Sequence, residues 1–390
     1  MNKYIYHLIL IIISFLLFVF ERDNMFSEDI VTNNISGTII VIIMLFLATY
    51  AVLFSSRDKK IIKDKVYKRY IALSILIYIV SITFSIIYPF GGRVTYGTII
   101  LPLLLFLFTA NCSKYAENDN MIIWCMTIVA VMLFYYYISN YFGNIMYEQD
   151  TQSNASYPIL YLLPFMLCHK NKALRIVFII MVLIVVMFSL KRGGIIALSC
   201  GLITYFYVSQ IAIKSRKIGI IPIISFIIII IGFLYFIRYF NENILSGMLS
   251  DRLIDSVDSK GSGRLDIYRY YWDVFKDSSL FQLIIGRGWI GSIKSGSVGL
   301  SCHNDFLEVL IDFGIIGLIF YLTFITSLIK FCGGMIKIKH EYAPAMGASI
   351  GLFLVNSMVS HIIIYSSYLI LFSLFWGFML YSMNNQYVKK

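Results

Sequence analysis

The chain has 390 residues, of which 59% are hydrophobic and only 14% are charged, and its formal net charge is +11. Apolar runs of about 20 residues recur along it, and one such helix spans the ~30 Å hydrocarbon core of a bilayer. These features exclude a soluble globular protein, whose helices would carry polar faces. We predict an all-α polytopic integral membrane protein, with a single transmembrane domain over residues 1–390.

Twelve membrane spans are predicted in chain order. The first is expected to stay in the membrane, because the polar residues 21–24 follow it where a cleaved signal peptide would have small residues. The sixth is short and holds Pro158 and Pro164, which makes it a candidate for a tilted or broken helix. The spans are Tyr4–Phe20, Ile35–Ser55, Tyr70–Tyr88, Tyr96–Ala110, Met121–Ser139, Tyr157–Cys168, Leu174–Leu190, Gly194–Ile213, Ile218–Ile237, Phe306–Ile329, Ala343–Ile363 and Ser366–Met383.

The distribution of charge predicts the orientation of these spans. With both termini in the cytoplasm, the inner segments hold 20 of the 32 Lys and Arg residues but only 5 of the 21 Asp and Glu residues. Residues 57–69 alone carry seven bases. This bias is the positive-inside pattern, so the net charge reflects orientation and contact with anionic lipid and does not indicate nucleic-acid binding.

Residues 238–305 form the only long polar interval and are predicted to be a large periplasmic or extracellular loop between the ninth and tenth helices, with short helices of its own. Acidic residues are scarce in the spans, with Glu308 and Asp312 as the main exception, which weakens the case for an ion-coupled transporter. No CxxC motif or His/Cys cluster is present, so no metal site is predicted.

Lys191 and Arg192 lie at the outer junction of the seventh and eighth predicted helices. Gly193 and Gly194 follow them, and glycine lets a backbone approach a ligand closely. One interpretation is that both bases only extend their side chains to lipid headgroups. The other is that Arg192 presents its planar guanidinium to a phosphate, and positive charge on the outer side favours this.

Arg264 opens an amphipathic segment after Gly261-Ser262-Gly263. The apolar residues of residues 265–275 share one helical face, so this helix is suited to the bilayer surface and its N-terminus to an anion. The alternative is that Arg264 pairs with Asp266 or another nearby acid.

His303 precedes the tenth span and is followed by Asn304 and Asp305. A histidine at a wet membrane surface can act as a general base or donate to a phosphate, but the same three residues could simply cap the helix. His361 is the other outer histidine. It lies in an apolar run and is expected to tolerate Gln with modest loss.

The motifs KRGG, GSGR with a downstream Trp, GRG and HNDFLEVLIDFGIIG follow one another over Met187–Tyr321. In order and spacing they resemble the O-antigen ligase and O-antigen polymerase (Wzy-type) superfamily. The resemblance implies that Arg192 and Arg264 bind a diphosphate and that His303 is the essential loop histidine. Lys191, Arg287 and Asn304 are possible supporting residues, and Lys191 stands where the family usually has Ser.

The resemblance further implies a polysaccharide polymerase that joins undecaprenyl-diphosphate-linked repeat units at the outer face of the bacterial cytoplasmic membrane. The reaction would need no metal and no cofactor. The expected partners are the lipid-linked donor and acceptor, the bilayer, a flippase and a chain-length regulator, and no nucleic acid. Two alternatives stay open, a ligase that transfers the glycan to lipid A-core and a flippase or exporter of lipid-linked glycan.

Overall fold

The computed structural model describes residues 1–25, 35–55, 59–85, 94–115, 120–144, 156–189, 191–214, 235, 264–295, 301–363 and 365–388. Every regular element in these residues is a helix. The helices are α1 Lys3–Asn24, α2 Ile35–Leu53, α3 Lys59–Lys63, α4 Lys65–Ser85, α5 Val94–Cys112, a 3-10 turn η1 Ser113–Tyr115, α6 Asn120–Asn144, α7 Ser156–Leu167, α8 Lys172–Phe188, α9 Arg192–Lys214, α12 Arg264–Lys276, α13 Leu280–Ile285, α14 Gly291–Ser295, α15 Asp305–Lys337, α16 Ala343–Val359 and α17 Ser366–Val388.

The chain is a multi-pass membrane protein. In the described residues α1, α4, α6, α9, α15 and α17 are long and apolar enough to cross a bilayer, and shorter apolar helices accompany them. Eleven of the twelve predicted spans coincide with a helix, whereas Ile218–Ile237 lies outside the described residues except for residue 235. The total of twelve spans therefore stays a prediction.

The two faces of α1 show why these helices belong in lipid. One face is exposed although it is apolar, and the opposite face is buried in the core. The exposed residues are Tyr4, Leu8, Ile11 and Phe15, and the buried ones include Tyr6, Leu10, Ile13 and Leu17. An apolar stripe at helical spacing on the outside of a bundle is stable against acyl chains, not against water.

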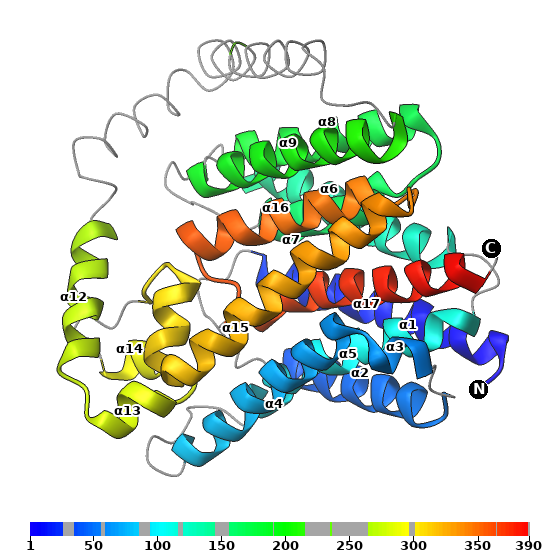
Figure 1. The fold of residues 1–390 in the computed structure, drawn as a ribbon. Helices are drawn as coiled ribbons and strands as arrows, with labels where there is room; N and C mark the ends of the chain where they lie inside the picture. Colours follow the sequence, from blue (N-terminus) through cyan, green and yellow to red (C-terminus); the bar gives the residue numbers. More distant parts are fainter. Residues whose placement is uncertain are drawn as a thin grey trace.

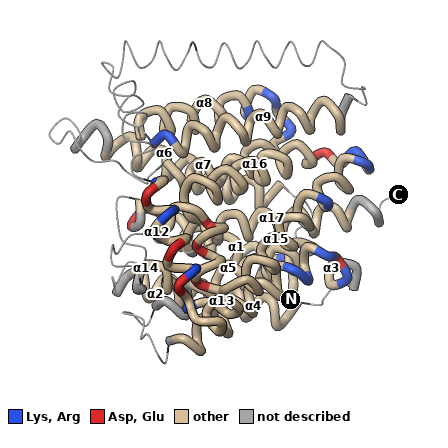
Figure 2. The backbone as a smooth tube through the Cα atoms, turned by 60° about the vertical axis from the view of Figure 1, so that its left-hand side comes forward, with Lys and Arg blue, Asp and Glu red and all other residues tan. Residues whose placement is uncertain are grey.

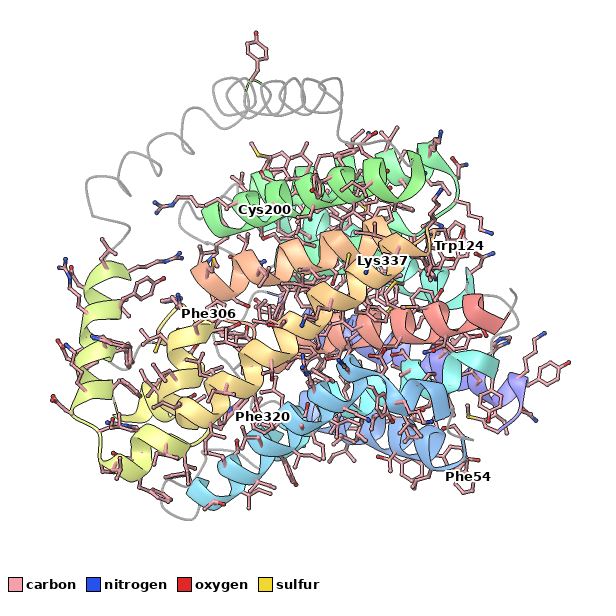
Figure 3. The ribbon with its side chains drawn as sticks, in the orientation of Figure 1. Phe54, Trp124, Cys200, Phe306, Phe320 and Lys337 are labelled. Carbon is pink, nitrogen blue, oxygen red and sulfur yellow. The ribbon has the colours of Figure 1, made fainter. Side chains whose placement is uncertain are left out.

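The helices form a bundle in which α17 packs against α5 and α7, and α16 packs against α9 (Figure 1). Polar contacts join neighbouring helices inside it, for example Trp376 Nε1 donating to Ser349 Oγ at 3.0 Å. Side chains fill the space between the ribbons, with Phe306 near the start of α15 and Lys337 near its other end (Figure 3). This packing fixes the positions of the helix ends, where the polar side chains of the candidate site lie.

The sixth predicted span is neither broken nor exposed. α7 is a continuous helix of 12 residues, and all of its residues are buried although Pro164 lies inside it. At 1.5 Å per residue it is about 18 Å long, shorter than the hydrocarbon core. Neighbouring helices cover it on every side, so its loss of one backbone hydrogen bond at Pro164 is tolerated inside protein.

The short helices α12, α13 and α14 lie together at one end of the bundle, and both chain termini lie at the opposite end (Figure 1). Lys and Arg dominate the end that carries α3, whereas Asp and Glu gather among α12–α14 (Figure 2). The described part of the predicted loop 238–305 thus contains short helices, as expected. Its residues 238–263 and 296–300 lie outside the described residues.

A break in α15 joins this layer to the membrane helices. Gly314 has φ 67° and ψ −170°, which interrupts the helical hydrogen bonds and frees the carbonyls of Ile311 and Asp312. The turn at residues 286–288 supplies new donors, because Arg287 N bonds Ile311 O at 3.0 Å and Gly288 N bonds Asp312 O at 2.8 Å. A Cβ on Gly286 would lie 2.2 Å from Asp312 O, so only glycine fits this backbone-to-backbone contact.

Two predicted details of the outer end need correction. α16 ends at Val359, before the predicted Ile363, and the chain then turns through His361. α12 does not offer its whole apolar face to the bilayer, because Tyr271 is fully buried against Cys302 and Ile311 while Trp272 is 48% exposed. Packing against α15 covers one side of α12, which the periodicity of a single helix does not show.

Candidate functional site

His303 is held in an unusual backbone conformation immediately before α15. Its φ is 50°, in the left-handed region that L residues rarely adopt. Tyr268 on α12 donates to His303 O at 3.2 Å and to Met358 O at 3.4 Å. Asn304 also donates to Met358 O, at 3.2 Å. These bonds tie α12, the His303 turn and the end of α16 together at one point.

The two residues after His303 have separate structural roles. Asn304 caps α15, since its side-chain oxygen accepts from Leu307 N at 3.1 Å. Asp305 is fully buried, and its Oδ1 accepts from Ile362 N at 2.8 Å and Ile363 N at 3.2 Å. The helix-capping interpretation is therefore correct for Asn304, while Asp305 fixes the connection between α16 and α17.

This connection places His361 against His303, a pairing that we did not predict. The two imidazole rings stack with centroids 5.0 Å apart and 26° between their planes. Ser301 Oγ lies 3.0 Å from His361 Nδ1, and the ring of Tyr365 stacks on the other side of His361 at 4.4 Å. The only signal in the sequence was that both histidines lie at outer ends of predicted helices.

The environment keeps His303 neutral near pH 7. Burial, followed by the positive charges of Arg264 and Lys191, lowers the pKa of His303 from 6.5 to about 4. Burial also lowers the pKa of His361, and His303, Arg264 and Lys191 act in the same direction. A neutral imidazole keeps one free ring nitrogen and can accept a proton, as a general base requires.

Arg264 lies at the first residue of α12, in electrostatic range of both histidines and of Tyr268 and Tyr157. The alternative that Arg264 pairs with Asp266 is not supported. Asp266 pairs instead with Arg269, at 3.4 Å. Among the ion pairs of the described residues none involves Arg264, so its charge is available to a ligand at the helix N-terminus.

Lys191 and Arg192 lie where α9 begins, and both are partly buried. The following Gly193 packs so closely that a Cβ there would meet Tyr157 Oη at 3.0 Å and Val359 at 3.6 Å. The turn therefore lies against the start of α7 and the end of α16, beside the histidines. Of its two bases, Lys191 is the one whose charge acts on His303, and Arg192 is its neighbour along the chain.

Arg287 has contacts of a structural kind. Its guanidinium donates to Val274 O at 3.1 Å and to Ser278 Oγ at 2.8 Å, and its backbone joins the turn to α15. These bonds connect the C-terminal end of α12 to the 286–288 turn. The described residues hold no group of three or more His, Cys, Asp or Glu side chains placed to bind a metal ion.

Comparison with known families matches part of this architecture. Residues 176–322 match the family model Wzy_C, described as O-antigen ligase. The matched stretch includes Lys191, Arg192, Arg264 and His303, the outer layer α12–α14 and the break in α15. No curated protein matches the chain.

Proposed function

We propose that this protein, whose residues 176–322 match the O-antigen ligase family model, is a polysaccharide polymerase. It joins repeat units carried on undecaprenyl diphosphate. The observation that carries this proposal is the stacking of His303 on His361, within the electrostatic reach of Arg264 and Lys191. A proton acceptor thus lies beside two positively charged side chains.

Each group has a distinct role in the transfer. The acceptor hydroxyl attacks the anomeric carbon of the donor glycan and gives its proton to His303. The bond between that carbon and the diphosphate oxygen breaks, and the leaving lipid diphosphate takes the bonding electron pair. Arg264, Arg192 and Lys191 stabilise the charge that develops on the phosphate. General base catalysis of this kind typically contributes ~10²–10⁴ in rate.

Lys191 in the KRGG motif has a different role in this scheme from the two arginines. Lys191 is an ammonium on a flexible chain, whereas an arginine presents a rigid fork with two parallel donors. We propose that Arg264 and Arg192 orient the diphosphate and that Lys191 adds charge without fixing geometry. His361 is then a positioning residue, because it holds the His303 ring from one face.

The arrangement of the ends supports the proposed orientation. The site lies at the end of the bundle that carries α12–α14, and the termini lie at the other end, where basic residues dominate (Figures 1 and 2). We place the basic end in the cytoplasm and the site outside the cytoplasmic membrane. Undecaprenyl lipids, a flippase that delivers them and a chain-length regulator are the proposed partners.

A ligase that transfers the glycan to lipid A-core is the second candidate, and the description of the matching family favours it. Donor and chemistry are the same in both reactions, and only the acceptor differs. An exporter is less well supported, because an exporter has no need for an imidazole kept neutral beside a cationic site.

The test is a transfer assay with purified protein in vesicles and a synthetic undecaprenyl-diphosphate repeat unit. We expect wild-type protein to form polymer, and His303→Ala to lose at least 100-fold in rate while it still binds the donor. His7→Ala, near the start of α1 at the end of the bundle that carries the chain termini, is the matched control and should keep its activity. Transfer only when lipid A-core is added would identify a ligase. Wild-type rates from His303→Ala would refute the catalytic role.

A further inference from the structure

Glu21 is a buried carboxylate at the end of α1 that faces the site. Its exposed fraction is 0%, and neither of its carboxylate oxygens has a hydrogen-bond partner in the described part of the chain. The two charged residues that follow do not explain it, because Arg22 and Asp23 pair with each other at 2.7 Å. The last turn of α1 thus holds one carboxyl group that no residue in the described part of the chain satisfies.

An unsatisfied buried carboxylate is costly, and ionisable side chains inside membrane proteins usually have a function. The two oxygens of a carboxyl group accept hydrogen bonds, and together they offer about four lone-pair sites. The described residues contain no group of three or more His, Cys, Asp or Glu that would make it part of a metal site. Among the described residues Glu21 has no hydrogen-bond donor, and a ligand rich in donors would supply them.

The neighbours of Glu21 are tyrosines, one of which has an unused hydroxyl group. Glu21 lies in electrostatic range of the hydroxyls of Tyr161 and Tyr368. Tyr161 is fully buried, and its hydroxyl also has no hydrogen-bond partner in the described residues. The rings of Tyr161 and Tyr368 pack edge to face at 5.2 Å, and Tyr157 contacts both, at 5.7 and 5.6 Å.

A continuous series of rings connects these tyrosines to the proposed catalytic histidine. Tyr368 stacks on Tyr365 at 5.3 Å, and Tyr365 stacks on His361 at 4.4 Å. His361 in turn stacks on His303 at 5.0 Å. Tyr157 also lies in the electrostatic range of Arg264. Glu21 is therefore connected to His303 through three intervening rings, those of His361, Tyr365 and Tyr368.

We propose that Glu21 is a sugar-binding residue, whose carboxylate accepts hydrogen bonds from the hydroxyl groups of a sugar in the transferred glycan. This inference rests on the proposed function, since it names the part of the site that holds the saccharide. Sugar hydroxyls provide the missing donors, and the tyrosine hydroxyls can complete the contacts. If the sugar belongs to the donor glycan, Glu21 controls the affinity for the donor. If it belongs to the acceptor glycan, Glu21 controls the KM of the acceptor.

A role in binding and a role in stability have different signatures here. Glu21→Gln keeps the shape of a buried side chain with polar atoms, so the thermal midpoint of the free protein in detergent should stay near that of wild type. The same substitution removes charge-assisted hydrogen bonds to the sugar, which typically correspond to about a 10- to 100-fold loss of affinity. A carboxylate with only a structural role would show loss of stability together with loss of activity.

The experiment compares binding of two probes, undecaprenyl diphosphate with and without its repeat unit, to wild-type protein, Glu21→Gln, Glu21→Asp and Asp23→Asn. We expect Glu21→Gln to weaken binding of the glycan-bearing lipid alone, which assigns the donor sugar, or to raise the KM of the acceptor at saturating donor, which assigns the acceptor sugar. Asp23→Asn, in the same helical turn, should match wild type.

Three results would overturn the proposal. The first is wild-type affinity and KM in Glu21→Gln. The second is a lowered thermal midpoint in that variant together with equal losses for both probes. The third is wild-type protein that binds the two lipids equally and shows no dependence on the acceptor sugar, because Glu21 would then have no saccharide to hold. Failure of transfer with a preserved glycan preference in binding would count against the polymerase alone.

Discussion

The low pKa of His303 gives a quantitative test of its role as a base. An unperturbed histidine titrates near 6.5, and burial with the charges of Arg264 and Lys191 lowers the pKa of His303 to about 4. At ~1.36 kcal/mol per pKa unit the difference is roughly 3 kcal/mol against protonation. The imidazole is only partly buried, so screening by water makes this figure an upper bound.

The pH dependence of kcat/KM reports the free enzyme and should reflect that pKa. We expect kcat/KM for glycan transfer to be independent of His303 ionisation between about pH 5 and 8, and to fall as the pH is lowered through about 4. In kcat the same fall should occur at higher pH, because a bound diphosphate anion favours the protonated imidazole.

A charge-removing variant makes the test specific. Arg264→Gln removes a positive charge next to His303, so the acid limb of its kcat/KM profile should move to higher pH, while the loss of diphosphate contacts lowers the whole curve. An acid limb near pH 6.5 in wild-type protein would refute the assignment, because the titrating group would then be an ordinary exposed histidine.

The same shift predicts how stability depends on pH. Between about pH 6.5 and 4 the unfolded chain binds a proton at this histidine and the folded chain does not. Stability should therefore fall as the pH is lowered through this window, and His303→Gln should reduce that dependence. Thermal unfolding in detergent at a series of pH values measures it.

Three further predictions concern the frame of the site. Gly314→Ala should lower the free energy of unfolding by at least about 1–2 kcal/mol, because φ is positive and a Cβ would lie 2.3 Å from a backbone oxygen of α13, whereas Gly333→Ala, with open space, should be neutral. Asp305→Ala should leave the backbone N–H groups of Ile362 and Ile363 without an acceptor. Each loss should lower the free energy of unfolding by about 1–3 kcal/mol, and both amides should exchange hydrogen faster. A reporter active only outside the membrane should be active when inserted within residues 264–295 and silent within residues 57–69, and equal signals would overturn the topology.

Hydropathy and charge were sufficient for the class of protein and for most helices. A stretch of apolar residues long enough for a bilayer forms a helix regardless of its neighbours, because the backbone must satisfy its own hydrogen bonds in lipid. The exceptions have local causes. α16 ends early because Asp305 binds the backbone N–H groups of Ile362 and Ile363, a contact between residues 57 and 58 positions apart.

The candidate site shows more clearly which features a sequence predicts and which depend on packing. His303 and Lys191 carry signals in the sequence because they are polar and lie at the ends of predicted spans, and Arg264 does because it opens the amphipathic segment. The stacking of His361 on His303 and the burial of Glu21 depend on how α1, α16 and α17 pack, which no local periodicity encodes. In the sequence Glu21 is the first residue after the predicted span Tyr4–Phe20, which predicts an exposed side chain, but in the structure it is buried.

The joint between the 286–288 turn and the break in α15 determines which substitutions the outer layer α12–α14 can tolerate. Its hydrogen bonds run from main chain to main chain, with Arg287 N and Gly288 N as donors. A joint of this kind requires small residues at Gly286 and Gly314 and asks little of the surrounding side chains. Mutations across the outward surface of α12 and α13 can therefore accumulate without altering the register of the loop on α15.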